Sequence, residues 1–160
     1  INYFNKNTEI YKGMKLIDEK LGGTTPLEII LKFPKKKKEN KEEDDFDDWD
    51  EDDQINNDKY WFTKDKLDKI KKVHDYLDSL DGVGKVLSLS SILQVAKKLN
   101  NNKELGGLEV GVLYAKIPDS IKKEIVNPYI SIKDNEARIN LRIKDSKEGL
   151  RRNELIKKIQ

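Results

Sequence analysis

The stretch IDEKLGGTTPLEIILKF, residues 17–33, decides the fold, because an amphipathic helix ends in it and a strand begins at once. Gly22 stands where a helix terminus favours a left-handed residue, and Pro26 prevents the helix from resuming. Apolar residues spaced by four, three and four predict one stripe on the helix: Ile10, Met14, Ile17 and Leu21. The junction therefore predicts a direct passage from helix to strand.

The strand after this junction is a nearly continuous apolar run. A run of this kind is typical of a strand that is covered on both faces of its sheet. Its apolar residues are Leu27, Ile29, Ile30, Leu31 and Phe33. We therefore expect this strand inside a layered sheet.

The charge of the chain is divided between one acidic block and a basic remainder. Residues 39–53 hold eleven acids and one base, a net charge of −10, whereas the other residues hold 31 bases and 19 acids, a net charge of +12. The overall charge of +2 therefore says little about partners. Outside the block, the 160-residue chain has the patterning of one domain that can bury a core.

Cysteine usage leaves the cellular compartment undecided, whereas the two chain ends indicate how the sequence relates to a longer protein. The sequence contains no cysteine, which excludes disulfides and thiolate metal sites. Within the residues given, neither the pattern of a signal peptide nor an apolar run of the roughly 20 residues that cross a bilayer occurs. Because the sequence starts at Ile1 and stops at Gln160 within a helical pattern, we expect a fragment of a longer protein.

Residues 34–58 form a segment too polar to support a packed structure. Lys35–Lys38 precede the acidic block, and aliphatic residues are nearly absent, so burial cannot offset the entropy of ordering. We expect a mobile charged loop here. Tyr60, Trp61 and Phe62 follow it, and such a trio more often anchors a loop end on a core than binds a ligand.

The rest of the chain alternates helical and strand patterns. Thr63 suits the N-cap of a helix that reaches Gly82, and Ser90 or Ser91 suits the cap of a helix that ends at Asn100. The other expected elements are a strand at 83–89, a glycine-weakened helix at 104–116, a short helix at 118–126, a hairpin of 129–132 with 136–144, and a last helix from about 147.

The hairpin has one apolar and one polar face. Ala137, Ile139, Leu141 and Ile143 alternate with Arg138, Asn140, Arg142 and Lys144. The order of elements predicts an α+β fold, a ferredoxin-like (split βαβ) sheet covered by helices, with a long acidic loop and a helical insert. We expect 26–33, 83–89 and 136–144 to share one sheet, and one further strand to follow the last helix.

Motifs for enzymatic chemistry are absent from the sequence. The single histidine, His74, borders the apolar stripe of its helix, where a structural role is more common than catalysis. No Ser/His/Asp set, P-loop, GxGxxG or HExxH motif occurs, and Gly22-Gly23 precedes a strand, whereas phosphate-binding glycines precede a helix. We expect no enzyme and assign no catalytic, cofactor-binding or metal-binding residue; substrate-binding residues cannot be assigned from one sequence.

Two charged segments could in principle bind a metal ion, nucleic acid or anionic lipid, but the residues around them disfavour these ligands. The acidic block lacks the alternation and the glycine of an EF-hand loop, so we expect a solvated segment without an ordered ion. Its carboxylates include Asp47, Asp48, Asp50, Glu51, Asp52 and Asp53. Lysines at 35–38 and 64–72 suit nucleic acid or anionic lipid, but the neighbouring acids compete and no aromatic residues are interleaved. We expect no nucleic-acid partner.

Four segments together resemble the large extracytoplasmic domain of resistance–nodulation–division (RND) superfamily exporters, in the branch related to the MMPL and patched-like proteins. Residues 3–33 (YFNKNTEIYKGMKLIDEKLGGTTPLEIILKF) are similar to the segment after the first membrane helix, where the helix–Gly-Gly–strand junction recurs. The acidic loop that closes on YWFT, residues 60–63, is similar to a loop of that branch. Residues 73–90 (VHDYLDSLDGVGKVLSLS) resemble its crossover helix and second strand, and residues 135–155 (NEARINLRIKDSKEGLRRNEL) resemble its hairpin and following helix.

The resemblance implies one porter-type domain, residues 1–160, on the periplasmic or equivalent side of a cell-membrane protein. Proteins of this family carry two such domains among their membrane helices and export amphiphilic or lipid-like molecules with the proton gradient. The implied partners are the parent's membrane helices, a second porter domain, an amphiphilic substrate, and an accessory protein or another copy of the chain. The proton-relay carboxylates of the family belong to membrane helices outside this sequence.

A second interpretation, from another class of function, stays open at this point. The chain would be a soluble protein-interaction module whose acidic loop docks on a basic partner. The two interpretations differ in what flanks the domain. An exporter needs hydrophobic segments of about 20 residues nearby, and a soluble module does not.

Overall fold

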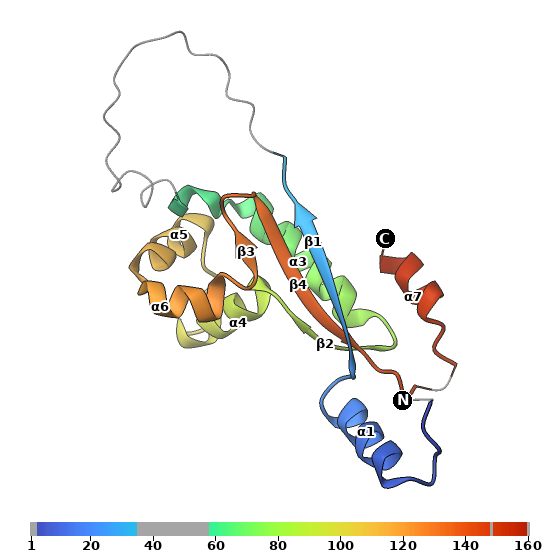
Figure 1. Ribbon diagram of the computed structural model, residues 1–160. Coiled ribbons are helices and arrows are strands. Elements are labelled where there is room, and N and C mark those ends of the chain that lie inside the picture. The colour runs from blue at the N-terminus through green and yellow to red at the C-terminus, as the bar shows by residue number, and fades with distance from the viewer. Residues whose placement is uncertain (1–2, 35–57, 148, 160) are drawn as a thin grey trace, which may run out of the picture.

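The computed structural model describes residues 3–34, 58–147 and 149–159, and Figure 1 shows its ribbon. The first half comprises α1 (Glu9–Lys20), β1 (Thr25–Lys32), the 3-10 turn η1 (Lys59–Trp61), α3 (Lys64–Ser79) and β2 (Val83–Leu87). The second half comprises α4 (Leu89–Leu99), α5 (Gly107–Lys116), α6 (Asp119–Ile121), the π-helical turn η2 (Lys122–Val126), β3 (Ile130–Ser131), β4 (Glu136–Ile143) and α7 (Arg152–Ile159). The chain is therefore of the α+β class.

The strands form one four-stranded antiparallel sheet with β4 at its centre. The order is β1–β4–β2, and β3 also pairs with β4. Because β1 and β2 are both antiparallel to β4, they run in the same direction on either side of it, and α3 lies on the connection between them. The prediction that 26–33, 83–89 and 136–144 share one sheet is confirmed.

The two faces of the sheet differ in burial. On β4, the side chains of Ala137, Ile139, Leu141 and Ile143 are at most 3% exposed, whereas Arg138 and Arg142 on the other face are exposed. The predicted apolar and polar faces of the hairpin are therefore confirmed.

The prediction that the first strand is covered on both faces is wrong. Burial alternates along β1, and Glu28 and Ile30 are exposed on the polar face of the sheet. There Glu28 lies beside Arg138, with 3.9 Å between Oε2 and Nε. The alternation of inward and outward side chains along β1 does not show in its sequence, because one outward position also holds an apolar residue. This residue is Ile30, which is 49% exposed on the polar face.

The apolar face of the sheet supports two clusters of buried residues among the residues described. One lies between β2, β4 and the helices α3 and α7, with Leu77, Val86 and Leu155 among its members. The other joins η1 and α3 to β3 and to the helical insert between β2 and β3, which consists of α4, α5, α6 and η2. It is built around Trp61, Phe62, Ile70, Leu89, Val110, Val126 and Ile130. The insert therefore has its own share of the core.

Several helix boundaries differ from the expected ones. The capping residue of α4 is Ser88, not Ser90 or Ser91: its hydroxyl accepts from the Ser90 amide at 3.1 Å, and its own amide donates to the Ser91 hydroxyl at 3.2 Å. The second strand therefore ends at Leu87. α3 begins after Thr63, as predicted, and α7 begins only at Arg152.

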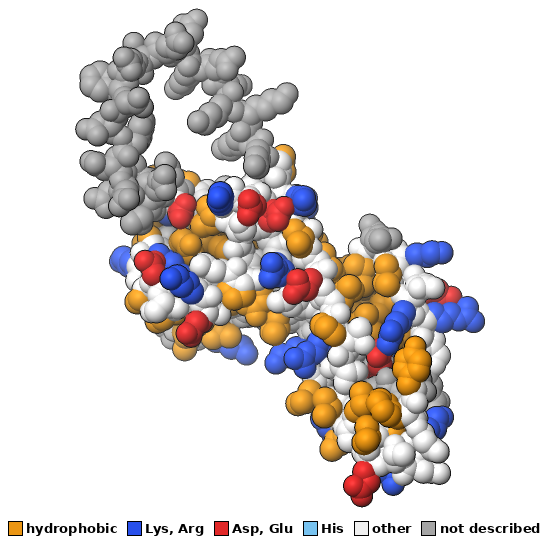
Figure 2. Space-filling view, viewed as in Figure 1, with side chains coloured by type: hydrophobic (Ala, Val, Ile, Leu, Met, Phe, Trp, Pro, Cys, Tyr) orange, Lys and Arg blue, Asp and Glu red, His pale blue; other side chains and the backbone are white. Residues whose placement is uncertain are grey.

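Helix α1 ends as predicted, but its apolar stripe remains exposed. Gly22 has φ = 79°, which suits the predicted left-handed terminus. Ile10, Ile17 and Leu21 are 60%, 47% and 58% exposed, and Figure 2 shows hydrophobic side chains gathered on this end of the molecule. The buried residue of α1 is instead Asp18.

Asp18 ties the junction between α1 and β1 to the end of β4. Its Oδ1 accepts from the Thr24 hydroxyl at 2.7 Å and from the Asp145 amide at 3.1 Å. Its Oδ2 accepts from the amide and the hydroxyl of Ser146 at 2.8 and 2.7 Å. Burial alone would raise the pKa of Asp18, but these hydrogen bonds outweigh it, and the pKa is lowered.

The predicted mobile loop at 34–58 falls outside the described residues, apart from Pro34 and Asp58 at its ends. The segments before and after this loop both form hydrogen bonds with the side chain of Asn135, in the turn before β4. The Asn135 side-chain amide donates to the carbonyls of Phe33 and Pro34, both at 3.1 Å. Its Oδ1 accepts from Trp61 Nε1 at 2.9 Å and from Lys66 Nζ at 2.7 Å.

Replacing Asn135 by glycine will lower the free energy of unfolding by about 2 kcal/mol, because four hydrogen bonds lose their shared partner. Glycine retains the positive φ of 57° at this position, so the change isolates the side chain. Urea unfolding followed by tryptophan fluorescence measures the effect. The neighbouring exposed Lys133→Ala is the control, and equal stability of both variants would contradict the role of Asn135.

Candidate functional site

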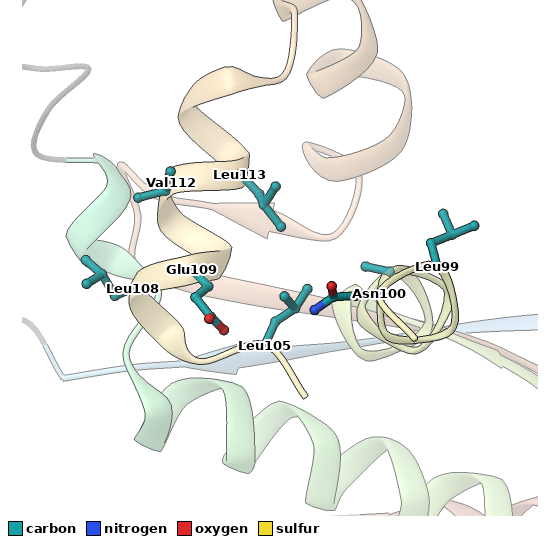
Figure 3. A pocket seen from close by; sticks show the side chains of 8 residues that line it. Leu99, Asn100, Leu105, Leu108, Glu109, Val112 and Leu113 are labelled. Carbon is teal, nitrogen blue, oxygen red and sulfur yellow. The ribbon is translucent and has the colours of Figure 1, made fainter. Parts of the chain in front are cut away.

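An apolar groove lies between α4 and α5 and has a volume of about 650 Å³. Figure 3 shows its walls: Leu113 and Leu105 point toward the space between the helices, and the Asn100 amide points toward Leu105. The lining residues are Ala96, Leu99, Asn100, Leu105, Leu108, Glu109, Val112 and Leu113. Six of these eight are apolar.

Two glycines of α5 explain why this helix turns its leucines outward. A Cβ on Gly107 would come within 2.2 Å of the Phe62 carbonyl oxygen, and one on Gly111 within 2.2 Å of that of Lys59. The helix therefore packs directly on η1 through its glycine face, and Val110 enters the core at 5% exposure. The glycines that weaken the helix in isolation are what let it pack.

The outward residues of α4 and α5 leave much apolar surface in water. Leu99 is 83% exposed, Leu108 67% and Leu113 45%. Contiguous exposed apolar surface of this kind often marks a binding site. The groove is therefore the candidate functional site.

Glu109, which lines the groove, and the neighbouring Glu104 each accept a hydrogen bond. Glu109 Oε2 accepts from the Gly106 amide at 2.7 Å and so caps the first turn of α5. Glu104 Oε1 accepts from Lys97 Nζ at 2.9 Å and lies 4.0 Å from Lys71 Nζ. The hydrogen bond and charge of Lys97, with the charge of Lys71, lower the pKa of Glu104.

A smaller and more polar pocket of about 260 Å³ lies on the other side of α5. Asp58, Tyr114 and Lys122 line it, and Lys122 Nζ lies 4.8 Å from the centre of the Tyr114 ring. Burial raises the pKa of Asp58, opposed by the charge of Lys122. Burial, Asp58 and Asp119 together raise the pKa of Tyr114. These groups form no nucleophile–base pair.

The structure places His74 in a buried position, 7% exposed, where its Nδ1 shares a hydrogen bond of 2.9 Å with the Ser88 hydroxyl. Ser88 is fully buried and caps α4, so the pair fixes the start of that helix. Trp61 and Phe62 are buried at 6% and 3%, as expected of an anchor, whereas Tyr60 is 64% exposed.

Two expectations concern ions and membranes. The acidic block lies outside the described residues, so its predicted lack of an ordered ion stays a prediction. Within the described part of the chain, no group of three or more histidine or acidic side chains is arranged to hold a metal ion. None of the helices described there has the length and hydrophobicity needed to cross a membrane.

The sequence pattern did not identify the groove or the role of Asp18. One signal was available for the groove: in α5, Leu108, Val110, Val112 and Leu113 are spread around the helix rather than along one stripe. Such a helix has more apolar surface than one core contact can cover. Asp18 had no comparable signal, because its partners at Asp145 and Ser146 are distant in sequence.

Comparisons with known proteins add no relative: no family model matches the chain, and neither the curated proteins nor the solved structures gave a match.

Proposed function

We propose that the chain is a non-catalytic, extracytoplasmic porter domain of a proton-driven RND-family exporter of amphiphilic or lipid-like molecules. The domain contributes to the substrate path or to contacts with other subunits. The observation that carries the proposal is the apolar groove between α4 and α5, because an export path for amphiphiles requires apolar surface that stays accessible to them.

The sheet topology agrees with this proposal. β1 and β2 run in the same direction with β4 between them, and α3 lies on the crossover, which is the arrangement of a split βαβ unit. We propose that the sheet is ferredoxin-like and that β1, whose described partner is β4, receives a further strand along its other edge. Three segments that resemble the exporter domain, 3–33, 73–90 and 135–155, contribute the strands of this unit.

The proposal assigns the remaining features to contacts within a larger protein. The exposed stripe of α1, with Ile10, Ile17 and Leu21, suits packing against the parent's membrane helices, a second porter domain or an accessory protein. No nucleophile or general base is required of the domain, because the proton-driven step belongs to the membrane helices of the parent.

Sequencing the gene on both sides of the segment that encodes residues 1–160 tests the proposal. We expect a hydrophobic segment of about 20 residues shortly before Ile1 and several more beyond Gln160. Polar sequence without such segments on both sides would contradict the exporter assignment. This outcome does not depend on whether the isolated chain binds any ligand.

A further inference from the structure

We infer that the surface where α1 meets the polar face of the sheet binds an acidic segment of a protein partner. The surface consists of the exposed apolar stripe of α1 and an adjoining recess of about 400 Å³, called the basic recess below. The inference goes beyond the proposed function, because it names the chemistry of a partner and uses a surface other than the groove between α4 and α5. Its test is independent of the sequence that flanks residues 1–160.

The basic recess carries two positive charges that no acid of the domain compensates. Its lining residues are Leu21, Pro26, Leu27, Glu28, Lys85, Leu87, Asn140, Leu141 and Arg142. Lys85 and Arg142 are exposed, and neither forms an ion pair among the described residues. The acid of the lining, Glu28, has Oε2 at 3.9 Å from Nε of Arg138. A carboxylate that enters the recess would therefore meet uncompensated positive charge.

The recess also contains a hydrogen-bond acceptor without a partner. Oδ1 of Asn140 is buried and has no hydrogen-bond partner among the described residues. The last torsion of asparagine is soft, so its amide can turn toward a donor in the recess. A polypeptide supplies N–H donors close to its carboxylates, whereas the phosphates and acyl chains of a lipid supply none. This difference favours a peptide over a membrane surface.

Leu21 connects the basic recess to the exposed stripe of α1. It lines the recess, is 58% exposed, and lies on the same face of the helix as Ile10 and Ile17. The buried Asp18 holds the helix through hydrogen bonds to the end of β4, so the stripe is not needed for this attachment. Apolar surface beside uncompensated cations fits an amphipathic segment with both apolar and acidic side chains.

Other occupants fit this surface less well. α1 also exposes Glu9 and Glu19, which an anionic bilayer lying along the helix would meet, whereas a peptide can place its carboxylates in the recess alone. In a two-fold contact between copies, Lys85 and Arg142 of one copy would approach the same recess of the other copy. Like charges across an interface oppose association.

Fluorescence anisotropy of a labelled leucine–glutamate peptide, about 12 residues long, tests the inference on the 160-residue chain. We expect saturable binding with one site, and weaker binding of the matched peptide with glutamine in place of every glutamate. The double variant Lys85→Gln/Arg142→Gln will lower the affinity roughly tenfold, and Ile17→Gln/Leu21→Gln will do so to a similar extent. Both pairs are exposed, so the fold is retained, which circular dichroism checks.

The matched control is Lys98→Gln/Lys103→Gln, which makes the same change of net charge at exposed positions outside the recess. It should bind the peptide like the unchanged chain. Absence of saturable binding, equal affinity for the glutamine peptide, or an equal loss in the control variant would overturn the inference. So would co-sedimentation with phosphatidylglycerol vesicles without peptide binding, or self-association that Ile17→Gln/Leu21→Gln abolishes.

Discussion

Replacing Asp18 by alanine will lower the free energy of unfolding by about 3 kcal/mol, one of the two largest effects expected in this protein. The carboxylate is fully buried and accepts four hydrogen bonds, two of them from the backbone amides of Asp145 and Ser146. Without it, these buried donors lose their partner, which costs more than a bond that water can replace. Chemical denaturation at neutral pH measures the loss.

The stabilisation of the fold by Asp18 will decrease as the pH is lowered. Its pKa is lower in the folded chain than in the unfolded chain, where an aspartate has a pKa of about 3.9. Its stabilising effect is therefore complete above that value and is lost as the pH falls through the folded pKa. The stability difference between the unchanged chain and Asp18→Asn should shrink in acid.

The neighbouring Glu19→Ala serves as the control for Asp18. Glu19 is exposed, and its pairing with Lys15 spans 3.8 Å on the helix surface, so the change should cost at most about 0.5 kcal/mol. A stability of Asp18→Ala within that margin would contradict the structural role of the buried carboxylate. A pH-independent difference for Asp18→Asn would contradict the role of its charge.

Replacing Gly84 by alanine will lower the free energy of unfolding by about 3 kcal/mol or more. A Cβ at this position would lie 1.7 Å from the carbonyl oxygen of Gly22. The nearest atoms are all backbone atoms of Gly22, so no side chain can move aside to make room. That carbonyl accepts a hydrogen bond from the Lys85 amide at 3.1 Å, which joins the end of α1 to β2. The added methyl group must therefore move Gly22, at the junction between α1 and β1, away from β2.

Gly13→Ala is the matched control for Gly84→Ala. Gly13 lies within α1, and no atom lies within 4 Å of a Cβ built there. Because alanine favours the helix over glycine, this variant should be more stable by about 1 kcal/mol. Thermal unfolding of both variants measures the contrast. A Gly84→Ala chain that melts with the unchanged chain would contradict the close approach of β2 to the junction.

The sequence predicted the elements that depend on local pattern. The end of α1 at Gly22, the cap of α3 at Thr63 and the two faces of β4 follow from residues that are close in sequence. The membership of 26–33, 83–89 and 136–144 in one sheet was also predictable, because a strand–helix–strand unit followed by a hairpin has few ways to form one sheet. These parts needed only turn chemistry and periodicity.

The features that the sequence did not predict depend on contacts between distant residues. The open face of β1 was missed because Ile30, an apolar residue, lies on the polar side of the sheet. In the sequence, Asp18 does not differ from an exposed acid of a surface helix, because its partner Ser146 is distant in the chain. The groove could not be predicted because it depends on how α5 packs on η1. The glycines of α5 permit this packing, but their positions in the sequence do not show which element the helix packs on.

The central claim is that the function of the domain resides in the groove between α4 and α5. Nuclear magnetic resonance of the ¹⁵N-labelled chain during a dodecanoate titration tests this claim directly. We predict amide shift changes concentrated in the last turn of α4, in residues 100–106 and in α5. Changes concentrated in α1 or on the polar face of the sheet, or none that saturate, would contradict it.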